Sequence, residues 1–276
     1  MRRYFSALAL VPLLLAGAGS AAAQNSVYLE ELTWTEVRDA IKAGKTTVII
    51  PTGGTEQNGP HMVLGKHNFV VHHNAGEIAK RLGNALVAPT IAYVPEGAVD
   101  PPSGGMRYAG TITLPIEHFV TLLEWTARSL KVHGFTDIVL IGDSGGNQAG
   151  LKAAAAALNK EWAGTRTRAY HVNDYNDAGA SPNSPYDHWL MEQGEKKEDI
   201  GSHAGIKDTS NLMAIEAIYH REGQLIRRDK LAKNGGDEGS GVSGDPRRAS
   251  VEYGKRGLQF RIEAAVKQIQ AMIKQR

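Results

Sequence analysis

The chain has 276 residues and contains no cysteine. A disulfide framework is therefore excluded, and so is an anchor on a lipid-modified cysteine. Without such cross-links the fold has to be stabilised by an ordinary hydrophobic core, for which the chain is long enough.

An excess of charge of either sign is also missing once the first residues are set aside. The formal net charge of +2 comes from Arg2 and Arg3, because their removal lowers the number of Lys and Arg from 31 to 29, and Asp and Glu also number 29. A neutral chain has no long-range attraction for nucleic acid or for an anionic membrane. We therefore expect neither as a partner.

Long hydrophobic runs are absent beyond the N-terminus. Residues 1–23 resemble a secretory signal peptide, with two arginines, an apolar stretch from about Phe5 to Leu15 and small residues up to Ala23. The apolar stretch is too short to span a bilayer. We expect cleavage after Ala23 and export, to the periplasm or the medium, with no membrane contact afterwards; a retained N-terminal anchor is the alternative.

The remaining residues, 24–276, are expected to form a single α/β domain. Short β-branched runs that end at glycine or proline predict strands at 47–51, 86–93, 137–141 and 167–172. Helical spacing of apolar residues predicts a short helix after Thr33 or Thr35 and longer ones at 68–82, 116–133, 151–162, 210–219 and 251–274. The segment 173–201 is expected to be a loop-rich insertion with one short helix. Such alternation predicts a three-layer α/β/α fold with a mainly parallel central sheet.

Polar side chains gather where the predicted strands end or where glycine-rich turns follow. They are Glu56, Asn58, His61 and His67, then Asp143, Ser144 and Asn147, then His203 and Asp208, and finally Asp245. The ends of parallel strands lie along one edge of a sheet, so these groups can converge. Carboxylates with imidazoles suit a zinc- or manganese-type ion or acid–base catalysis. The alternative is that each of them satisfies the backbone of its own turn.

Four spaced motifs resemble those of one known family. They read E-Q-N-G-P-H-M-V-L-G-K-H at 56–67, G-D-S-G-G-N at 142–147, H-A-G-I-K-D-T-S at 203–210 and G-V-S-G-D-P at 241–246. In this order they are similar to E-x-H-G-P-H-L-P-L-G-x-D, N-G-H-G-G-N, H-A-G-x-x-E-T-S and G-V-x-G-D-P of the creatininase (creatinine amidohydrolase) family. The resemblance implies that family's fold, hydrolysis of a C–N bond in a small amide or cyclic amide, and a homo-oligomer, commonly a hexamer.

The resemblance also implies a divalent metal, zinc or manganese, but several ligand positions are changed. Glu56 keeps the family's first ligand, whereas Asn58 replaces a histidine and His67 replaces the aspartate that bridges two ions. Ser144 stands where another ligand histidine is found. Asparagine and serine are weak donors, and one imidazole nitrogen holds only one ion. This favours one ion over two.

A mononuclear site is therefore predicted from Glu56 and His67, completed by Asp143 or by Asp208, which takes the place of the family's glutamate. In that mechanism the cation polarises the carbonyl and activates a water. His203 matches the family's catalytic histidine and would move a proton to the leaving nitrogen, with Asp208 orienting it or binding the ion.

Two other functions remain open from the sequence. The altered ligands would also suit a non-catalytic periplasmic binding or structural protein on the same fold. Ser144, on a glycine-rich turn, could be the nucleophile of a metal-free esterase or amidase, although capping of the following helix is favoured for it. His61 is expected to make a supporting hydrogen bond, and Lys66 is expected to face solvent.

Overall fold

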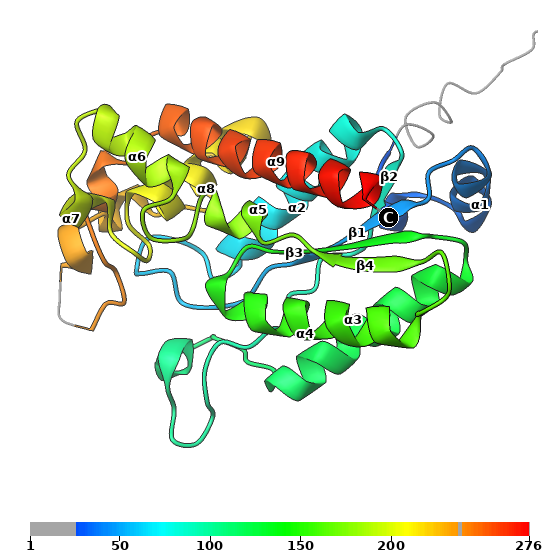
Figure 1. Cartoon of the computed structure of the whole chain (residues 1–276). Coiled ribbons are helices and arrows are strands. Elements are labelled where there is room, and N and C mark those ends of the chain that lie inside the picture. Colours follow the sequence, from blue (N-terminus) through cyan, green and yellow to red (C-terminus); the bar gives the residue numbers. More distant parts are fainter. Residues whose placement is uncertain (1–25, 237–238, 276) are drawn as a thin grey trace, which may run out of the picture.

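The computed structural model describes residues 26–236 and 239–275 (Figure 1). The predicted signal peptide lies outside the described residues. Within the described ranges no helix is long and apolar enough to cross a membrane.

Four parallel strands form the central sheet, in the order β2-β1-β3-β4. Their bounds are Thr47–Thr52 for β1, Ala85–Val87 for β2, Asp137–Gly142 for β3 and Arg168–His171 for β4. β1 and β3 pair along their whole length. Each of the three pairings is parallel, which confirms the predicted fold class.

The second strand is shorter than the predicted 86–93. Pro89 has no N–H to donate to a ladder, and regular pairing ends just before it, at Val87. Further along, the chain stays beside the sheet through a single bridge between Ile91 and Thr52. The apolar run therefore continues as an irregular segment, and the prediction of a strand to residue 93 was wrong.

The long helices lie where apolar spacing predicts them. Their bounds are Trp34–Lys42 for α1, Lys66–Leu82 for α2, Ile116–Val132 for α3, Gln148–Glu161 for α4, Ile206–Ile218 for α8 and Val251–Lys274 for α9. Thr33 caps α1 in a capping box with Glu36. The insertion is more helical than expected, because it holds α5 (Asp174–Asp177), α6 (Pro185–Glu192) and α7 (Lys197–Ile200) rather than one short helix.

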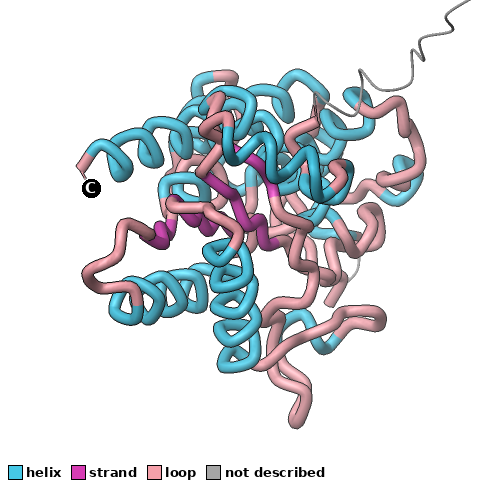
Figure 2. Tube along the Cα trace, turned by 90° about the vertical axis from the view of Figure 1, so that its right-hand side faces the viewer, coloured by secondary structure: helices cyan, strands magenta, loops and turns pink. Residues whose placement is uncertain are grey.

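Helices cover both faces of the sheet (Figures 1 and 2). Neighbouring residues of a strand point to opposite faces, so Ile49 of β1 belongs to a core cluster with α2, α8 and α9. Val48 and Ile50 belong instead to a second cluster, with α3 and α4. The sheet is therefore the middle of three layers, with one core cluster between it and the helices on each side. Val48, Ile49 and Ile50 are fully buried.

The strand order places a crevice between β1 and β3. After β1 the chain enters α2 on one face of the sheet, and after β3 it enters α4 on the other face. The two connections leave the ends of neighbouring strands toward opposite faces of the sheet. Open α/β sheets bind their ligands at such a point. Glu56 follows β1 and Asp143 follows β3 directly, so both sit at this crevice.

Candidate active site

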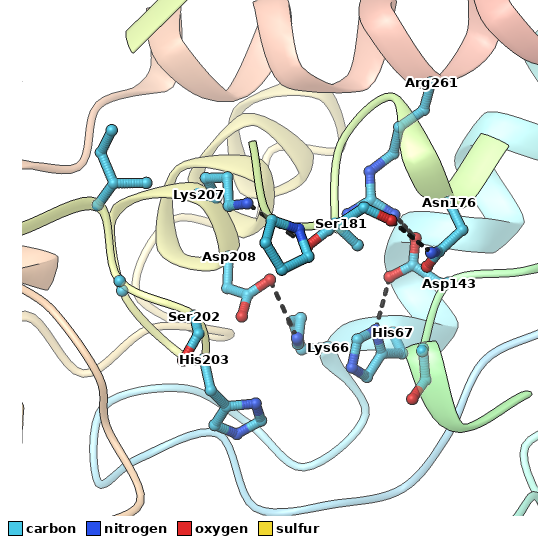
Figure 3. A pocket seen from close by; sticks show the side chains of 17 residues that line it. Lys66, His67, Asp143, Asn176, Ser181, Ser202, His203, Lys207, Asp208 and Arg261 are labelled. Carbon is cyan, nitrogen blue, oxygen red and sulfur yellow. Dashed lines mark hydrogen bonds and ion pairs between the residues drawn. The ribbon is translucent and has the colours of Figure 1, made fainter. Parts of the chain in front are cut away.

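A cavity of about 260 Å³ lies where β3 ends and α2 and α8 begin. Its lining includes Lys66, His67, Asp143, Ser144, Lys207, Asp208, His203 and Arg261. Figure 3 shows His203 and Asp208 on one side, His67, Asp143 and Arg261 on the other, and Lys66 between them. The structure thus brings together residues from three of the predicted segments.

His67 is held between two carboxylates. Its Nε2 lies 2.8 Å from Glu56 Oε1, and its Nδ1 lies 2.6 Å from Asp143 Oδ2. Ionised carboxylates only accept hydrogen bonds, so both ring nitrogens donate and the ring is an imidazolium. Burial and the Lys66 ammonium oppose this charge, but the bonds to Asp143 and Glu56 raise the pKa of His67 to about 9.

Asp143 is the most heavily bonded carboxylate of the site. Its Oδ1 accepts from Arg261 at 2.6 Å and from the Tyr175 hydroxyl at 2.8 Å, while Oδ2 accepts from His67. Burial disfavours the charge on Asp143, but Arg261 and His67 outweigh it and lower the pKa to about 2. Glu56, also buried, has its pKa lowered to about 2 by His67.

Arg261 is a site residue that the sequence reading missed. It lies on α9 with only 2% of its surface exposed, among buried apolar neighbours such as Leu258, Ile262 and Ala265. A charged residue on the apolar face of an amphipathic helix was the available sign, because such a residue needs a buried partner.

Lys66 is the second missed residue, and its expected place in solvent was wrong. Its side chain is 2% exposed, and its Nζ lies 3.2 Å from Asp208 Oδ1 (Figure 3). Lys66 opens α2 at the inner wall of the cavity. Although burial acts in the other direction, the Lys66 ammonium helps to hold the pKa of Asp208 far below its usual value.

His203 keeps one ring nitrogen available. Both of its protein contacts fall on Nε2, at 3.0 Å from the carbonyl oxygen and 3.0 Å from the side-chain amide of Gln57. In either tautomer Nδ1 therefore has no hydrogen-bond partner among residues 26–236 and 239–275. Asp208 does not contact the ring; its Oδ2 accepts from the backbone N–H of Ala204 at 2.8 Å and so fixes the turn that carries His203.

Ser144 serves as a helix cap. Its hydroxyl accepts a hydrogen bond of 3.3 Å from the backbone N–H of Gly146 at the start of the turn before α4. In the described part of the chain it has no imidazole or carboxylate partner that could activate it. Asn147 and Asp245 also serve the backbone: Asn147 donates to residues 52 and 53, and Asp245 caps the turn at Arg247.

The other two polar residues of the first motif are supporting groups. The Asn58 amide donates to the carbonyl oxygen of Glu56 at 2.9 Å and does not line the cavity. The Nε2 of His61 lies 3.0 Å from the Thr209 hydroxyl. Burial lowers the pKa of His61 to about 4, so its ring is neutral.

Glu96 adds a carboxyl group that no motif indicated. It lies in the loop after β2, is 8% exposed, and has one oxygen without a hydrogen-bond partner among the described residues. Burial, and then the neighbouring charge of Glu56, raise its pKa to about 8. Glu96 is therefore protonated at neutral pH, beside an ionised Glu56.

The predicted metal ligands Glu56, His67 and Asp143 are close together, but their arrangement does not fit a divalent ion. The two carboxylates contact different nitrogens of the His67 ring and so lie at opposite edges of it, where one ion cannot reach all three. An imidazolium has no lone pair to offer a metal. Among the described residues, no group of three or more His, Cys, Asp or Glu side chains could hold a metal ion.

Comparisons with known proteins agree with the sequence motifs. The sequence profile described as "Creatininase: Creatinine amidohydrolase" matches residues 30–269. The chain is 27% identical to the mycofactocin precursor peptide peptidase of Mycolicibacterium smegmatis, over 76% of this chain and 78% of that protein. It is 28% identical to the creatinine amidohydrolase of Pseudomonas putida, over 69% of this chain and 72% of that protein.

The fold also matches solved structures. A crystal structure of creatinine amidohydrolase superposes with a TM-score of 0.71 at 21% identity, over 90% of this chain and 98% of that one. A structure described as "Creatininase Mn" superposes with a TM-score of 0.69 at 21% identity, over 90% of this chain and 99% of that one. Manganese is thus named for a protein of the same fold.

Proposed function

Because this chain belongs to the creatininase family, we propose that it is an exported hydrolase that cleaves a C–N bond in a small amide or cyclic amide. The observation that carries this proposal is the meeting of His203 with the Lys66–Asp208 pair in one cavity. A volume of about 260 Å³ suits a small molecule, since it lies just under the range of drug-sized ligand pockets.

The residues of the cavity divide the work of hydrolysis. His203 Nδ1 takes a proton from the attacking water and returns it to the leaving nitrogen when the C–N bond breaks. Asp208 holds the turn of His203 through the Ala204 N–H. His67 and Asp143 line the cavity beside them, and the hydrogen bonds of His67 to Asp143 and Glu56 hold its ring in place.

A screen of small amides, lactams and cyclic ureides with the purified mature protein tests this proposal. We expect hydrolysis of at least one class, detected as released amine or carboxylate. His203→Ala should lower kcat at least about 100-fold, because general acid–base groups contribute about 10²–10⁴. His118→Ala is the matched control, since this exposed histidine lies on α3, across the sheet. Ligand binding without turnover would identify a binding protein instead.

Ser144→Ala separates this mechanism from that of a serine esterase or amidase. The capping role predicts full hydrolytic activity and a loss of stability of about 1 kcal/mol. Loss of activity in a variant that is still folded would make Ser144 the nucleophile.

A further inference from the structure

Cations of the protein itself neutralise the carboxylates of the site. Glu56 is paired with His67 at 2.8 Å, and Asp143 with Arg261 at 2.6 Å. Asp208 is paired with Lys66 at 3.2 Å. At the rim, Lys207 is paired with Asp187 at 2.6 Å, so the fourth pair is neutral too.

A divalent ion would break this balance. Among the described residues, Glu56, Asp143 and Asp208 each already have a positive partner, so the ion would add two uncompensated charges to a region where Lys66, Asp143 and Arg261 are almost fully buried. Charges in a poorly solvated interior are tolerated when they are paired and are costly when they are not. The pairs would have to separate before a metal could bind.

Lys66 is the cation best placed to act on a substrate. An ammonium group has three protons, and Asp208 is the one partner found for it in the described part of the chain. His67 uses both of its protons on carboxylates, and Arg261 bonds Asp143. Lys66 lines the cavity between His67 and His203, and its remaining protons are available to an oxygen bound there (Figure 3).

We propose that this site takes no metal ion and that the Lys66 ammonium supplies the positive charge that polarises the scissile carbonyl. The role that this proposal gives to Lys66 rests on the proposed hydrolase function. Water oxygen bonds to the carbonyl carbon, and the π electrons move to the oxygen, which Lys66 stabilises. The water proton passes to His203. The C–N bond then breaks, its electron pair leaves with nitrogen, and nitrogen takes the proton from His203.

Metal analysis tests whether the site takes a metal ion, and it needs no substrate. The mature protein, produced with zinc and manganese in the medium, should contain less than about 0.1 equivalent of either ion, because a structural or catalytic site would be filled. The melting temperature should be the same with and without a chelator. About one equivalent that the variant Glu56→Gln removes would overturn the proposal.

The absence of cysteine allows a sharp test of Lys66. We expect Lys66→Cys to lower kcat at least about 100-fold, in the range of one lost oxyanion donor, with KM within about threefold. Alkylation of the single introduced thiol with 2-bromoethylamine rebuilds an ammonium at nearly the lysine length, and kcat should recover at least about tenfold. Iodoacetamide, which adds a neutral group of similar size, should restore nothing.

Equal recovery with both reagents, or full activity of unmodified Lys66→Cys, would show that charge at this position is not catalytic. If the loss of Lys66 leaves Asp208 unpaired and unfolds the protein, the same alkylation is done on Lys66→Cys combined with Asp208→Asn. Failure to find any substrate counts against the proposed function. The metal measurement is separate, because it decides between a bound ion and internal cations in either case.

Discussion

Arg261 shows how one side chain can set the charge of the whole site. Its guanidinium holds Asp143 ionised, and Asp143 in turn accepts from His67, which contacts Glu56. Because these groups are buried, water cannot take the place of one that is removed, and its partner is left with an uncompensated charge.

Arg261→Met should therefore be strongly destabilising, by about 3–5 kcal/mol in the free energy of unfolding, the cost of breaking a buried ion pair. Urea unfolding followed by circular dichroism measures it. Lys255→Met is the matched control on the same helix, because Lys255 is exposed, and its effect should stay within about 0.5 kcal/mol. Adding Asp143→Asn should recover part of the loss. A cost below about 1 kcal/mol would mean that Arg261 is not needed to balance Asp143.

Glu96 gives the stability of the protein a pH dependence. Burial and the charge of Glu56 raise the pKa of Glu96 from 4.5 to about 8, so the folded state keeps a proton that the unfolded state loses. The stability due to protonated Glu96 is fully present below 4.5 and is lost as the pH rises toward 8.

The glutamine side chain of the variant Glu96→Gln cannot ionise, so this variant should not lose that stability as the pH rises. The melting temperature of the variant, relative to that of the wild type, should rise by several degrees between about pH 5 and pH 8. Glu117→Gln, which changes an exposed glutamate, should run parallel to the wild type. Parallel curves for Glu96→Gln would show that Glu96 is ionised in the folded protein.

The residues of the site divide by how far their partners lie along the chain. Glu56, His67 and Asp143 could be found from sequence, because they stand beside strand ends and glycine-rich turns. Lys66 could not, since a charged side chain is assigned to solvent until a partner is known, and the one sign for Arg261 was its place on the apolar face of a helix. Asp143 is 118 residues away from Arg261, and only the fold brings them together.

At the scale of elements, the contact between α8 and α9 positions both sides of the cavity. α8 carries Asp208, and α9 carries Arg261. The two helices approach closely at Gly254, where an added Cβ would lie 1.8 Å from the backbone oxygen of Ser210. A backbone atom cannot rotate away as a flexible side chain can, so a larger residue would push the helices apart.

Gly254→Ala tests this close contact. Alanine favours a helix by up to about 1 kcal/mol over glycine, whereas overpacking costs about 1–3 kcal/mol, so we expect a net loss of stability. Thermal melts measure the balance. Lys267→Ala, an exposed change on the same helix, should be close to neutral. If Gly254→Ala were more stable than the wild type, the helices would be free to move apart.

Elements with a strong period were predictable, and weakly marked ones were not. The C-terminal helix has the predicted bounds, since apolar residues recur along 24 residues without a proline. The second strand was predicted to be too long, because its apolar run continues past Pro89 whereas regular strand pairing ends before it. Short helices such as α5 and α7 have four residues each, too few for a period to show.

On the scale of the whole molecule, two large clusters on opposite faces of the sheet form most of the described core, and no disulfide supports them. This bears on the proposed export, because proteins of oxidising compartments often rely on disulfides. Stability that comes from burial alone is independent of the redox state.

Export itself is the prediction that concerns the whole chain. The two arginines, the short apolar stretch and the small residues up to Ala23 predict cleavage before Gln24. Expressed with its natural N-terminus in a Gram-negative host, the protein should be found in the periplasmic fraction, and its N-terminal sequence should begin at Gln24. Arg2→Glu combined with Arg3→Glu should slow processing, because the charged start of the leader guides its insertion. An intact N-terminus in a membrane fraction would instead identify a retained anchor, and cytoplasmic protein of full length would contradict both readings.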